Sequence, residues 1–384
     1  MGYLGEDVPK LGFGLMRLPK DDEGHIIVDE VKEMVDAFMA AGCRYFDTAR
    51  AYGESESAIR QALVERYPRE SFYLATKNAA WIGNKTAEDA RHDFDISLEQ
   101  TGAGYFDFYL IHNTGDSRTA VFDRFDMWSF VTELKEQGKV RHSGFSHHGT
   151  AEDRDDLRTA HPQMEFVQLQ INYADWENSG VQAHKCVDVC LKHGKSIVIM
   201  EPVRGGSLAN PPEPVAQILR EANPDASYVS WALRFAMGVP NLITVLSGMS
   251  TLEQMQQNLE TWKGYVPLSD DERATLVRAQ EKLAELMDNP CTACHYCMKV
   301  CPMEINIANA MEALNRASIY GKLDGRRHFD FGNRDSQNKA ADCIKCGKCE
   351  EACPQHIPIR EKLERAAELF QNPNDPPRKS SLTS

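Results

Sequence analysis

Four side chains that could together move a proton stand near the ends of predicted strands. Asp47 follows the second predicted strand, Lys77 the third and His112 the fourth, and Tyr52 comes five positions after Asp47. A carboxylate, a phenol, an ammonium and an imidazole are the groups that general acid–base chemistry uses. Plainer roles exist for each: Asp47 could cap a helix, Lys77 could be a surface lysine, and His112 could be a buried histidine. Their joint placement after consecutive strands favours a catalytic cluster.

Two cysteine runs near the carboxyl end have the spacing of iron–sulfur ligands. Each has the form Cys-x2-Cys-x2-Cys-x3-Cys-Pro, which is the run of bacterial ferredoxins, where the fourth cysteine serves the other cluster. We therefore expect two [4Fe-4S] clusters, one on Cys291, Cys294, Cys297 and Cys353, the other on Cys343, Cys346, Cys349 and Cys301. Structural zinc is the alternative, but it usually takes two CxxC pairs separated by a longer loop.

The distribution of cysteine and charge indicates two unlike parts. Eight of the 11 cysteines lie in the two runs, and Cys43, Cys186 and Cys190 are most simply core residues. From Pro290 onward 14 Lys and Arg face 12 Asp and Glu, a balance of +2, which leaves −16 for the front part of a chain with net charge −14. Such an acidic part is not expected to bind nucleic acid, which needs clustered cations. No apolar run is long enough to span a membrane, and the first residues resemble no secretory signal, so we expect a cytoplasmic protein.

The elements that must position these residues alternate between strand and helix. Short apolar runs predict strands at 11–16, 44–47, 72–76, 106–111, 140–145, 166–171, 196–200 and 243–247. Helical patterns lie at 29–41, 55–67, 87–101, 122–137, 181–193 and 251–262, with Asp29 as a predicted N-cap and Gly42 and Gly194 as helix stops. About eight strand–helix pairs predict a (β/α)8 TIM barrel. An open doubly wound sheet needs a third glycine where Arg17 stands, and we reject it.

Beyond the barrel, a charged helical segment at 268–288 ends at Asn289-Pro290, and helical sequence at 307–320 separates the two cysteine runs. We therefore expect the barrel at 1–285, a mainly helical ferredoxin-like domain at 286–370 and a flexible tail at 371–384.

The strand-end residues carry a family resemblance. Phe46-Asp47-Thr48-Ala49 with Tyr52-Gly53, Ala75-Thr76-Lys77 and Leu110-Ile111-His112 resemble the aldo–keto reductase pattern, from about residue 10 to about residue 263. The resemblance implies that Tyr52 protonates a substrate carbonyl, that Lys77 lowers the pKa of Tyr52, that Asp47 holds Lys77 and that His112 orients the carbonyl. It also implies a nicotinamide cofactor, because no side chain can donate a hydride.

Cofactor positions follow from the same resemblance. The positions implied for the nicotinamide end are Gly14, Met16, Ser146, His147 and Gln168, and those for the pyrophosphate loop are Met200, Pro202 and Arg204. Gly248, Gln254 and Asn258 match the adenosine end. Met200 replaces an aromatic residue and His147 an asparagine. The basic pair that many members place on the 2′-phosphate is missing, so NADP or NAD stays open, with Arg204 the one obvious substitute.

The whole chain allows several functions. The leading hypothesis is a nicotinamide-dependent carbonyl reductase whose clusters transfer electrons, with a ferredoxin- or flavodoxin-like redox partner. Nicotinamide moves two electrons and each cluster one, so exchange between them needs a flavin or a radical step, and nothing in the sequence indicates a flavin. Alternatively the clusters are structural or a docking point for a partner. A non-catalytic regulatory or binding barrel is the third possibility.

Overall fold

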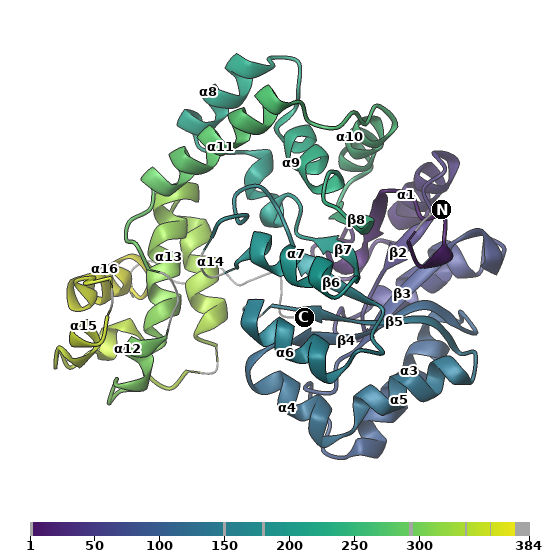
Figure 1. The fold of residues 1–384 in the computed structure, drawn as a ribbon, viewed down its shortest axis with the longest axis horizontal. Coiled ribbons are helices and arrows are strands. Elements are labelled where there is room, and N and C mark those ends of the chain that lie inside the picture. Colours follow the sequence, from purple (N-terminus) through teal and green to yellow (C-terminus); the bar gives the residue numbers. More distant parts are fainter. Residues whose placement is uncertain are drawn as a thin grey trace.

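Eight parallel strands close into a barrel, each hydrogen-bonded to the next and the last to the first (Figure 1). The strands are β1 (Leu11–Gly14), β2 (Tyr45–Asp47), β3 (Tyr73–Asn78), β4 (Phe106–Thr114), β5 (Val140–His147), β6 (Phe166–Gln170), β7 (Ser196–Met200) and β8 (Leu242–Gly248). The structure is a computed structural model that describes residues 3–148, 151–178, 181–291, 295–334, 336–353 and 355–372. The predicted (β/α)8 barrel is confirmed.

Helices surround the barrel and continue beyond it. Those of the barrel and its rim are α1 (Val28–Ala40), α2 (Ser55–Ile59), α3 (Ala87–Thr101), α4 (Asp116–Arg124), α5 (Met127–Glu136), α6 (Ala151–Ala160), α7 (Ala183–Lys192), α8 (Glu213–Ala222), α9 (Tyr228–Met237), α10 (Leu252–Lys263) and α11 (Asp270–Glu285). The C-terminal helices are α12 (Tyr296–Lys299), α13 (Ile307–Tyr320), α14 (Lys322–Gly332), α15 (Lys348–Glu351) and α16 (Ile359–Phe370). No helix in these ranges is long and apolar enough to cross a bilayer.

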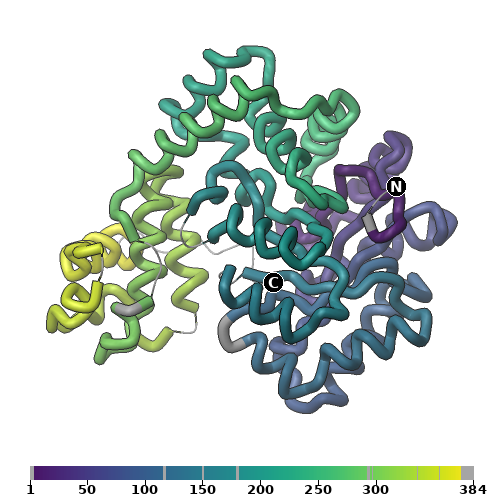
Figure 2. Tube along the Cα trace, in the orientation of Figure 1, coloured from purple at the N-terminus to yellow at the C-terminus, as the bar shows by residue number. Residues whose placement is uncertain are grey.

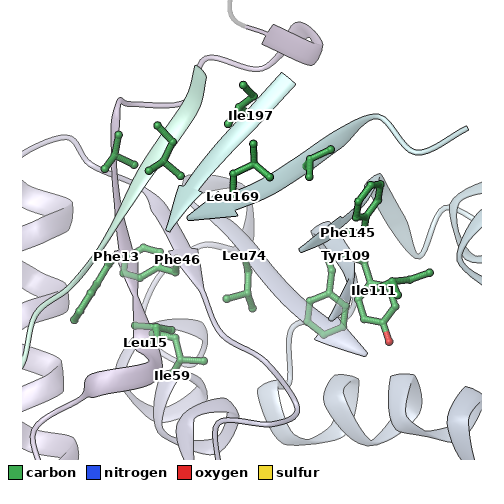
Figure 3. Packing of buried hydrophobic residues seen from close by; sticks show 14 of the residues in the cluster. Phe13, Leu15, Phe46, Ile59, Leu74, Tyr109, Ile111, Phe145, Leu169 and Ile197 are labelled. Carbon is green, nitrogen blue, oxygen red and sulfur yellow. The ribbon is translucent and has the colours of Figure 1, made fainter. Parts of the chain in front are cut away.

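The strands are buried on both faces, as parallel strands covered by helices must be. Outward side chains such as Phe13, Phe46 and Leu74 pack against the helices (Figure 3). The ring centroids of Phe46 and of Phe38 in α1 are 5.3 Å apart. Inward side chains fill the barrel and include the Phe166 ring. Gly144 faces that ring: a Cβ at Gly144 would lie 2.6 Å from the Phe166 carbonyl oxygen, so only glycine fits there.

Several predicted boundaries shift, each for a local reason. The predicted helix at 122–137 is two helices, α4 and α5, because Asp126 takes a left-handed conformation with φ 51°. Asp29 is not the N-cap of α1; Ile27 occupies that position and Asp29 lies in the first turn. Gly42 and Gly194 follow their helices with positive φ, as predicted for helix stops. The strands β3 and β4 run further than predicted, so Lys77 and His112 lie within strands rather than after them.

The C-terminal helices form a second apolar core beside the barrel. Side chains of α13, α14 and α16 pack with three cysteines of the two runs in this core. After α11 the chain passes into these helices, and α13 and α14 stand between the barrel and the group α12, α15 and α16 (Figures 1 and 2). Cys294, Pro354 and most of the predicted tail, from residue 373 on, lie outside the described residues.

The helix α13 meets the barrel at the ends of β6 and β7. Arg204, after β7, pairs with Asp175 at 3.0 Å and reaches Glu312 of α13 at 3.6 Å. Its guanidinium also lies 5.0 Å from the centre of the Tyr320 ring. Glu312 and Tyr320 are eight residues apart and therefore share one face of α13. The carboxyl ends of the strands thus face the cysteine-bearing part of the chain.

Candidate active site

Three neighbouring strands bring Asp47, Lys77, His112 and Tyr52 together at the carboxyl end of the barrel. The Lys77 ammonium donates to the Asp47 carboxylate, to the Thr48 carbonyl at 2.7 Å and to the Tyr52 hydroxyl at 3.4 Å. The rings of Tyr52 and His112 meet edge to face with centroids 5.7 Å apart. Lys77 has three acceptors for its three N–H donors, so its position is fixed.

Burial governs the proton affinities of this cluster. Lys77 is 1% exposed, and although burial disfavours its charge, the Asp47 carboxylate outweighs that effect and raises the pKa of Lys77. Burial of the Tyr52 phenol raises its pKa, and the opposing charge of Lys77 offsets only part of this. Lys77 thus acts on the pKa of Tyr52 in the direction that the resemblance implied, but burial outweighs its contribution. The phenol stays protonated at neutral pH and can act as a proton donor.

His112 is a neutral imidazole in this site. Burial lowers its pKa well below the ordinary value, and the positive charges of Lys77, His148 and Arg118 lower it further. The Nδ1 atom is buried without a hydrogen-bond partner in the described part of the chain. Trp81 packs beside the ring with centroids 6.1 Å apart, and its indole N–H donates to the His112 carbonyl at 3.0 Å. A neutral ring with a free nitrogen can hydrogen-bond a small polar ligand.

Most residues predicted for the nicotinamide end lie at the same carboxyl end of the barrel as the catalytic cluster. Gly14 ends β1, and Met16, on the short helix that follows, is 57% exposed. The Ser146 hydroxyl accepts from the Asn113 amide at 2.7 Å. Gln168 is buried beside Asp47, and its Oε1 has no partner in the ranges given above. A buried polar atom without a partner, such as this one, fits a polar ligand such as a nicotinamide.

His147 is not brought together with this group. Successive strand residues point to opposite faces, so His147 shares the outer face of β5 with Phe145, and the two rings lie 6.3 Å apart. Its Nδ1 is 3.0 Å from the Thr114 hydroxyl. We therefore leave His147 out of the cofactor positions.

The loop after β7 is tightly turned and tied to α13. Met200 ends β7, Pro202 is buried, and Arg204, Gly205 and Gly206 all have positive φ. Asp175, which is 1% exposed, holds Arg204 and also accepts from Asn172 at 2.9 Å. With Asp175 and Glu312 as partners, the Arg204 guanidinium is not a free substitute for the missing 2′-phosphate ligands, contrary to the sequence-based suggestion.

The other arginine near this loop is Arg17, which the sequence analysis named only as an interruption of a glycine pattern. Its side chain lies over Gly248, and its guanidinium lies 3.4 Å from where a Cβ would stand on Gly205. Arg17 is exposed, between the loops after β7 and β8. The sequence did not indicate this position of Arg17, because Arg17 comes close to Gly248 only when β1 pairs with β8.

Beyond Gly248, the predicted adenosine positions have local partners. Gln254 accepts from the Ser250 amide at 2.8 Å and is exposed. Asn258 is buried and donates to the Ser247 hydroxyl at 2.9 Å, which ties α10 to β8. Gln254 therefore lies at the surface of the mouth, and Asn258 supports the strand from behind.

The cysteines line two cavities that each combine both runs. One is lined by Cys343, Cys346 and Cys349 together with Cys301, the other by Cys291 and Cys297 together with Cys353. The remaining walls are mainly apolar, and Ile307, the first residue of α13, lines both cavities. Thiol donors in an apolar cavity suit iron–sulfur clusters. This grouping has the exchanged fourth cysteine that the spacing predicted.

Comparison with known proteins agrees with this architecture. The model of the aldo/keto reductase family matches residues 10–281, which is well over half of the chain. The chain belongs to the aldo/keto reductase family. A second model, for a 4Fe-4S dicluster domain, matches residues 290–357. The protein is therefore an oxidoreductase of this family with a C-terminal 4Fe-4S domain.

Individual relatives match the barrel part of this reductase. An aldo-keto reductase of Mycolicibacterium vanbaalenii is 28% identical over 275 residues, covering 70% of this chain and 87% of the relative. One from Mycobacterium sp. strain KMS is 30% identical over 142 residues, or 37% of this chain and 47% of the relative. In that second case the match spans about half of the relative's length.

Solved structures share the barrel fold. The holo form of an aldo-keto reductase from Bacillus halodurans superposes with a TM-score of 0.58 at 23% identity, covering 73% of this chain and 95% of the other. An aldo-keto reductase from Klebsiella pneumoniae in complex with NADPH gives a TM-score of 0.56 at 20% identity, covering 71% and 90%. At such identities the likeness concerns the fold alone.

Proposed function

We propose that the barrel reduces the carbonyl group of a small molecule with a nicotinamide cofactor. The observation that carries the proposal is the contact of a fully buried Lys77 with both Asp47 and the Tyr52 hydroxyl, beside a neutral His112. A bound nicotinamide would supply the hydride. The chain itself must then hold the carbonyl and deliver one proton to its oxygen.

Tyr52 is the proton donor in this proposal. As the carbonyl carbon is reduced, its oxygen becomes an alkoxide, which is a far stronger base than a phenolate, so even a phenol of raised pKa can give up its proton. The Lys77 ammonium stabilises the phenolate that forms, because it lies 3.4 Å from the Tyr52 oxygen. Asp47 keeps Lys77 charged, and an N–H group of the neutral His112 imidazole orients the carbonyl by donating a hydrogen bond to its oxygen.

The cofactor would lie across the carboxyl ends of the strands. We assign its nicotinamide end to Gly14, Met16, Ser146 and Gln168, its pyrophosphate to the Met200–Gly206 loop with Pro202, and its adenosine end to Gly248 and Gln254, with Asn258 in support. Arg17 is our candidate for a contact with the 2′-phosphate of the cofactor, because it is exposed between Gly205 and Gly248. A guanidinium there would favour NADPH over NADH.

We propose that the C-terminal part holds two [4Fe-4S] clusters with exchanged fourth cysteines. Cys294, which lies outside the described residues, would complete the set of Cys291, Cys297 and Cys353. Glu312, which meets Arg204, comes five residues after Ile307, or about 8 Å along the axis of α13. The cysteine cavities are therefore close to the carboxyl end of the barrel. We propose that the clusters exchange electrons there with a redox partner of ferredoxin or flavodoxin type. Cluster thiolates persist in a reducing compartment, so we propose the cytoplasm.

The division into a barrel at 1–285, a cluster domain at 286–370 and a tail at 371–384 remains our proposal for the whole chain.

A purely structural role of the clusters is the second candidate function. It is favoured by the packing of cysteines into the second apolar core.

The test is NADPH oxidation with a panel of aldehydes by protein purified anaerobically with its clusters intact. We expect turnover by the wild type and a loss of about 100- to 10000-fold in kcat for Tyr52→Phe, the range typical of general acid catalysis. NADPH binding, measured by fluorescence titration, should be unchanged in the variant. A kcat of Tyr52→Phe close to that of the wild type would refute the assignment of Tyr52 as the proton donor.

A further inference from the structure

One half-buried cation at the mouth of the barrel has no part in the chemistry proposed above. Arg118 lies in the first turn of α4, which follows β4 and therefore the strand that carries His112. Its Nε donates to the Asn113 carbonyl at 3.0 Å. Asn113 has φ 58°, a left-handed conformation that asparagine tolerates better than most residues. The guanidinium is thus held in place by the backbone just after the catalytic strand.

Aromatic rings connect this guanidinium to the catalytic residues. The Arg118 guanidinium lies 5.9 Å from the centre of the Trp81 ring, and Trp81 lies 6.1 Å from the His112 ring. His112 in turn lies 5.7 Å from the Tyr52 ring. The four side chains therefore form a continuous wall that starts at the proton donor and ends at a positive charge.

The charge of Arg118 has no carboxylate partner among the side chains that the structure describes. In the described part of the chain, the only hydrogen bond of its guanidinium is the one to the Asn113 carbonyl. Its remaining N–H donors are not among the described buried polar atoms that lack a hydrogen-bond partner. Its field nevertheless reaches the active site, since it contributes to the lowered pKa of His112. Unpaired guanidinium donors that face an opening are suited to an anionic ligand.

The position of the wall fixes where such an anion would lie on a substrate. A carbonyl oxygen between Tyr52 and His112 cannot extend toward Asp47 and Lys77, because those side chains are buried and bonded to each other. Trp81, beside His112, offers a surface along which the remainder of the molecule can extend. The negative charge of Glu201, in the loop after β7, contributes to the raised pKa of Tyr52.

We propose that Arg118 selects substrates whose carbonyl group is joined, through a short chain or one ring, to a carboxylate or phosphate group. The proposal rests on the carbonyl-reductase function proposed above and names its substrate class. Arg118 binds the anionic group by charge-assisted hydrogen bonds, and Trp81 packs against the part of the substrate between the two ends. The reaction itself is unchanged: the carbonyl carbon receives the hydride and its oxygen the proton of Tyr52.

The test compares two aldehydes that differ only in charge, 4-carboxybenzaldehyde and its methyl ester, with the cluster-loaded protein and NADPH. The wild type should prefer the charged aldehyde in kcat/KM. Arg118→Gln should reduce kcat/KM for the charged aldehyde by about 10- to 100-fold, mainly through KM, the range that hydrogen bonds to charged groups span. For the ester it should change kcat/KM by less than about twofold. A second pair, glyceraldehyde 3-phosphate and glyceraldehyde, distinguishes phosphate from carboxylate.

Arg124→Gln is the matched control, because Arg124 is exposed on the same helix and stacks on Phe125 instead of Trp81. It should leave the preference intact. Arg118→Lys keeps the charge and should retain part of the preference if the glutamine variant fails to fold. Equal kcat/KM for acid and ester in the wild type, in both pairs, would overturn the proposal while leaving the reductase function standing.

A binding measurement decides the case without turnover. Calorimetry with NADP-loaded wild type should show tighter binding of 4-(hydroxymethyl)benzoate than of its methyl ester, and the difference should disappear in Arg118→Gln. Equal binding of acid and ester would contradict the proposal even if no aldehyde were reduced, whereas absence of reduction alone would count against the proposed function.

Discussion

Replacing Lys77 with methionine removes the charge that stabilises a Tyr52 phenolate while keeping most of the side-chain volume. The ammonium lies 3.4 Å from the Tyr52 oxygen and is 1% exposed. Coulomb's law at an effective dielectric constant of about 20 gives about 5 kcal/mol between unit charges at that distance. If the transition state carries about half of the phenolate charge, the loss is about 2.5 kcal/mol, or about 60-fold in rate. Full charge transfer raises the loss to about 4000-fold.

The assay is single-turnover oxidation of NADPH with excess enzyme, so that product release does not limit the rate. Lys77→Met should lower the single-turnover rate by about 60- to 4000-fold and leave NADPH binding within about twofold, because Lys77 donates to Asp47, Thr48 and Tyr52 and not to the predicted cofactor positions. Lys10→Met is the control: Lys10 is an exposed lysine just before β1 that donates to the Met237 carbonyl at 2.7 Å. It should leave the rate unchanged. A rate in folded Lys77→Met within about threefold of the wild type would refute the role given to this charge.

Further predictions concern stability, pH, the clusters and the contact between the two parts. Lys77→Met should lower the free energy of unfolding by about 3–5 kcal/mol, because Asp47, 2% exposed, loses its counter-charge. In urea unfolding, the double variant Lys77→Met with Asp47→Asn should lose much less free energy than the sum of the two single variants. Since the pKa of His112 is lowered below its ordinary 6.5 and that of Tyr52 is raised above 10.0, kcat should be flat between these values; a titration within that window would contradict the assignment. Iron analysis should give about eight iron atoms per chain, and Cys301→Ala should damage the cluster of the Cys343–Cys349 run in electron paramagnetic resonance spectra, while Cys190→Ala should leave both clusters intact. Arg204→Gln deprives buried Asp175 of its cation and α13 of its partner at the rim, and should speed proteolytic separation of the cysteine-bearing part from the barrel.

The barrel could be predicted from the sequence because its signals are local. Runs such as Ser196–Met200 are continuous and apolar, and the predicted strand has the bounds of β7. The helix predicted at 87–101 also has the bounds of α3, where Thr86 closes a capping box with Asp89. The split between α4 and α5 was missed because Asp126 adopts a left-handed conformation without a glycine or proline to indicate it.

The site could be predicted only in part, for a different reason. Asp47, Lys77 and His112 follow from strand order, because the carboxyl ends of parallel strands meet at one rim. The partners of Arg204 could not be predicted, since Glu312 is more than 100 residues away and the contact depends on how α13 packs on the barrel. Arg118 was missed for a similar reason: its significance comes from Trp81 and from the absence of an ion pair in the described part of the chain.

In the proposed reaction, the carbonyl carbon beside Tyr52 would receive its hydride directly from a bound nicotinamide. The most direct test is to supply NADPH carrying deuterium at the transferred position to the cluster-loaded protein, with 4-carboxybenzaldehyde as substrate, and to analyse the alcohol by mass spectrometry. We predict one deuterium at the carbinol carbon of every product molecule and none when NADPH is unlabelled and the solvent is deuterated. Product whose carbinol hydrogen comes from the solvent would contradict the claim and show that electrons and protons arrive separately.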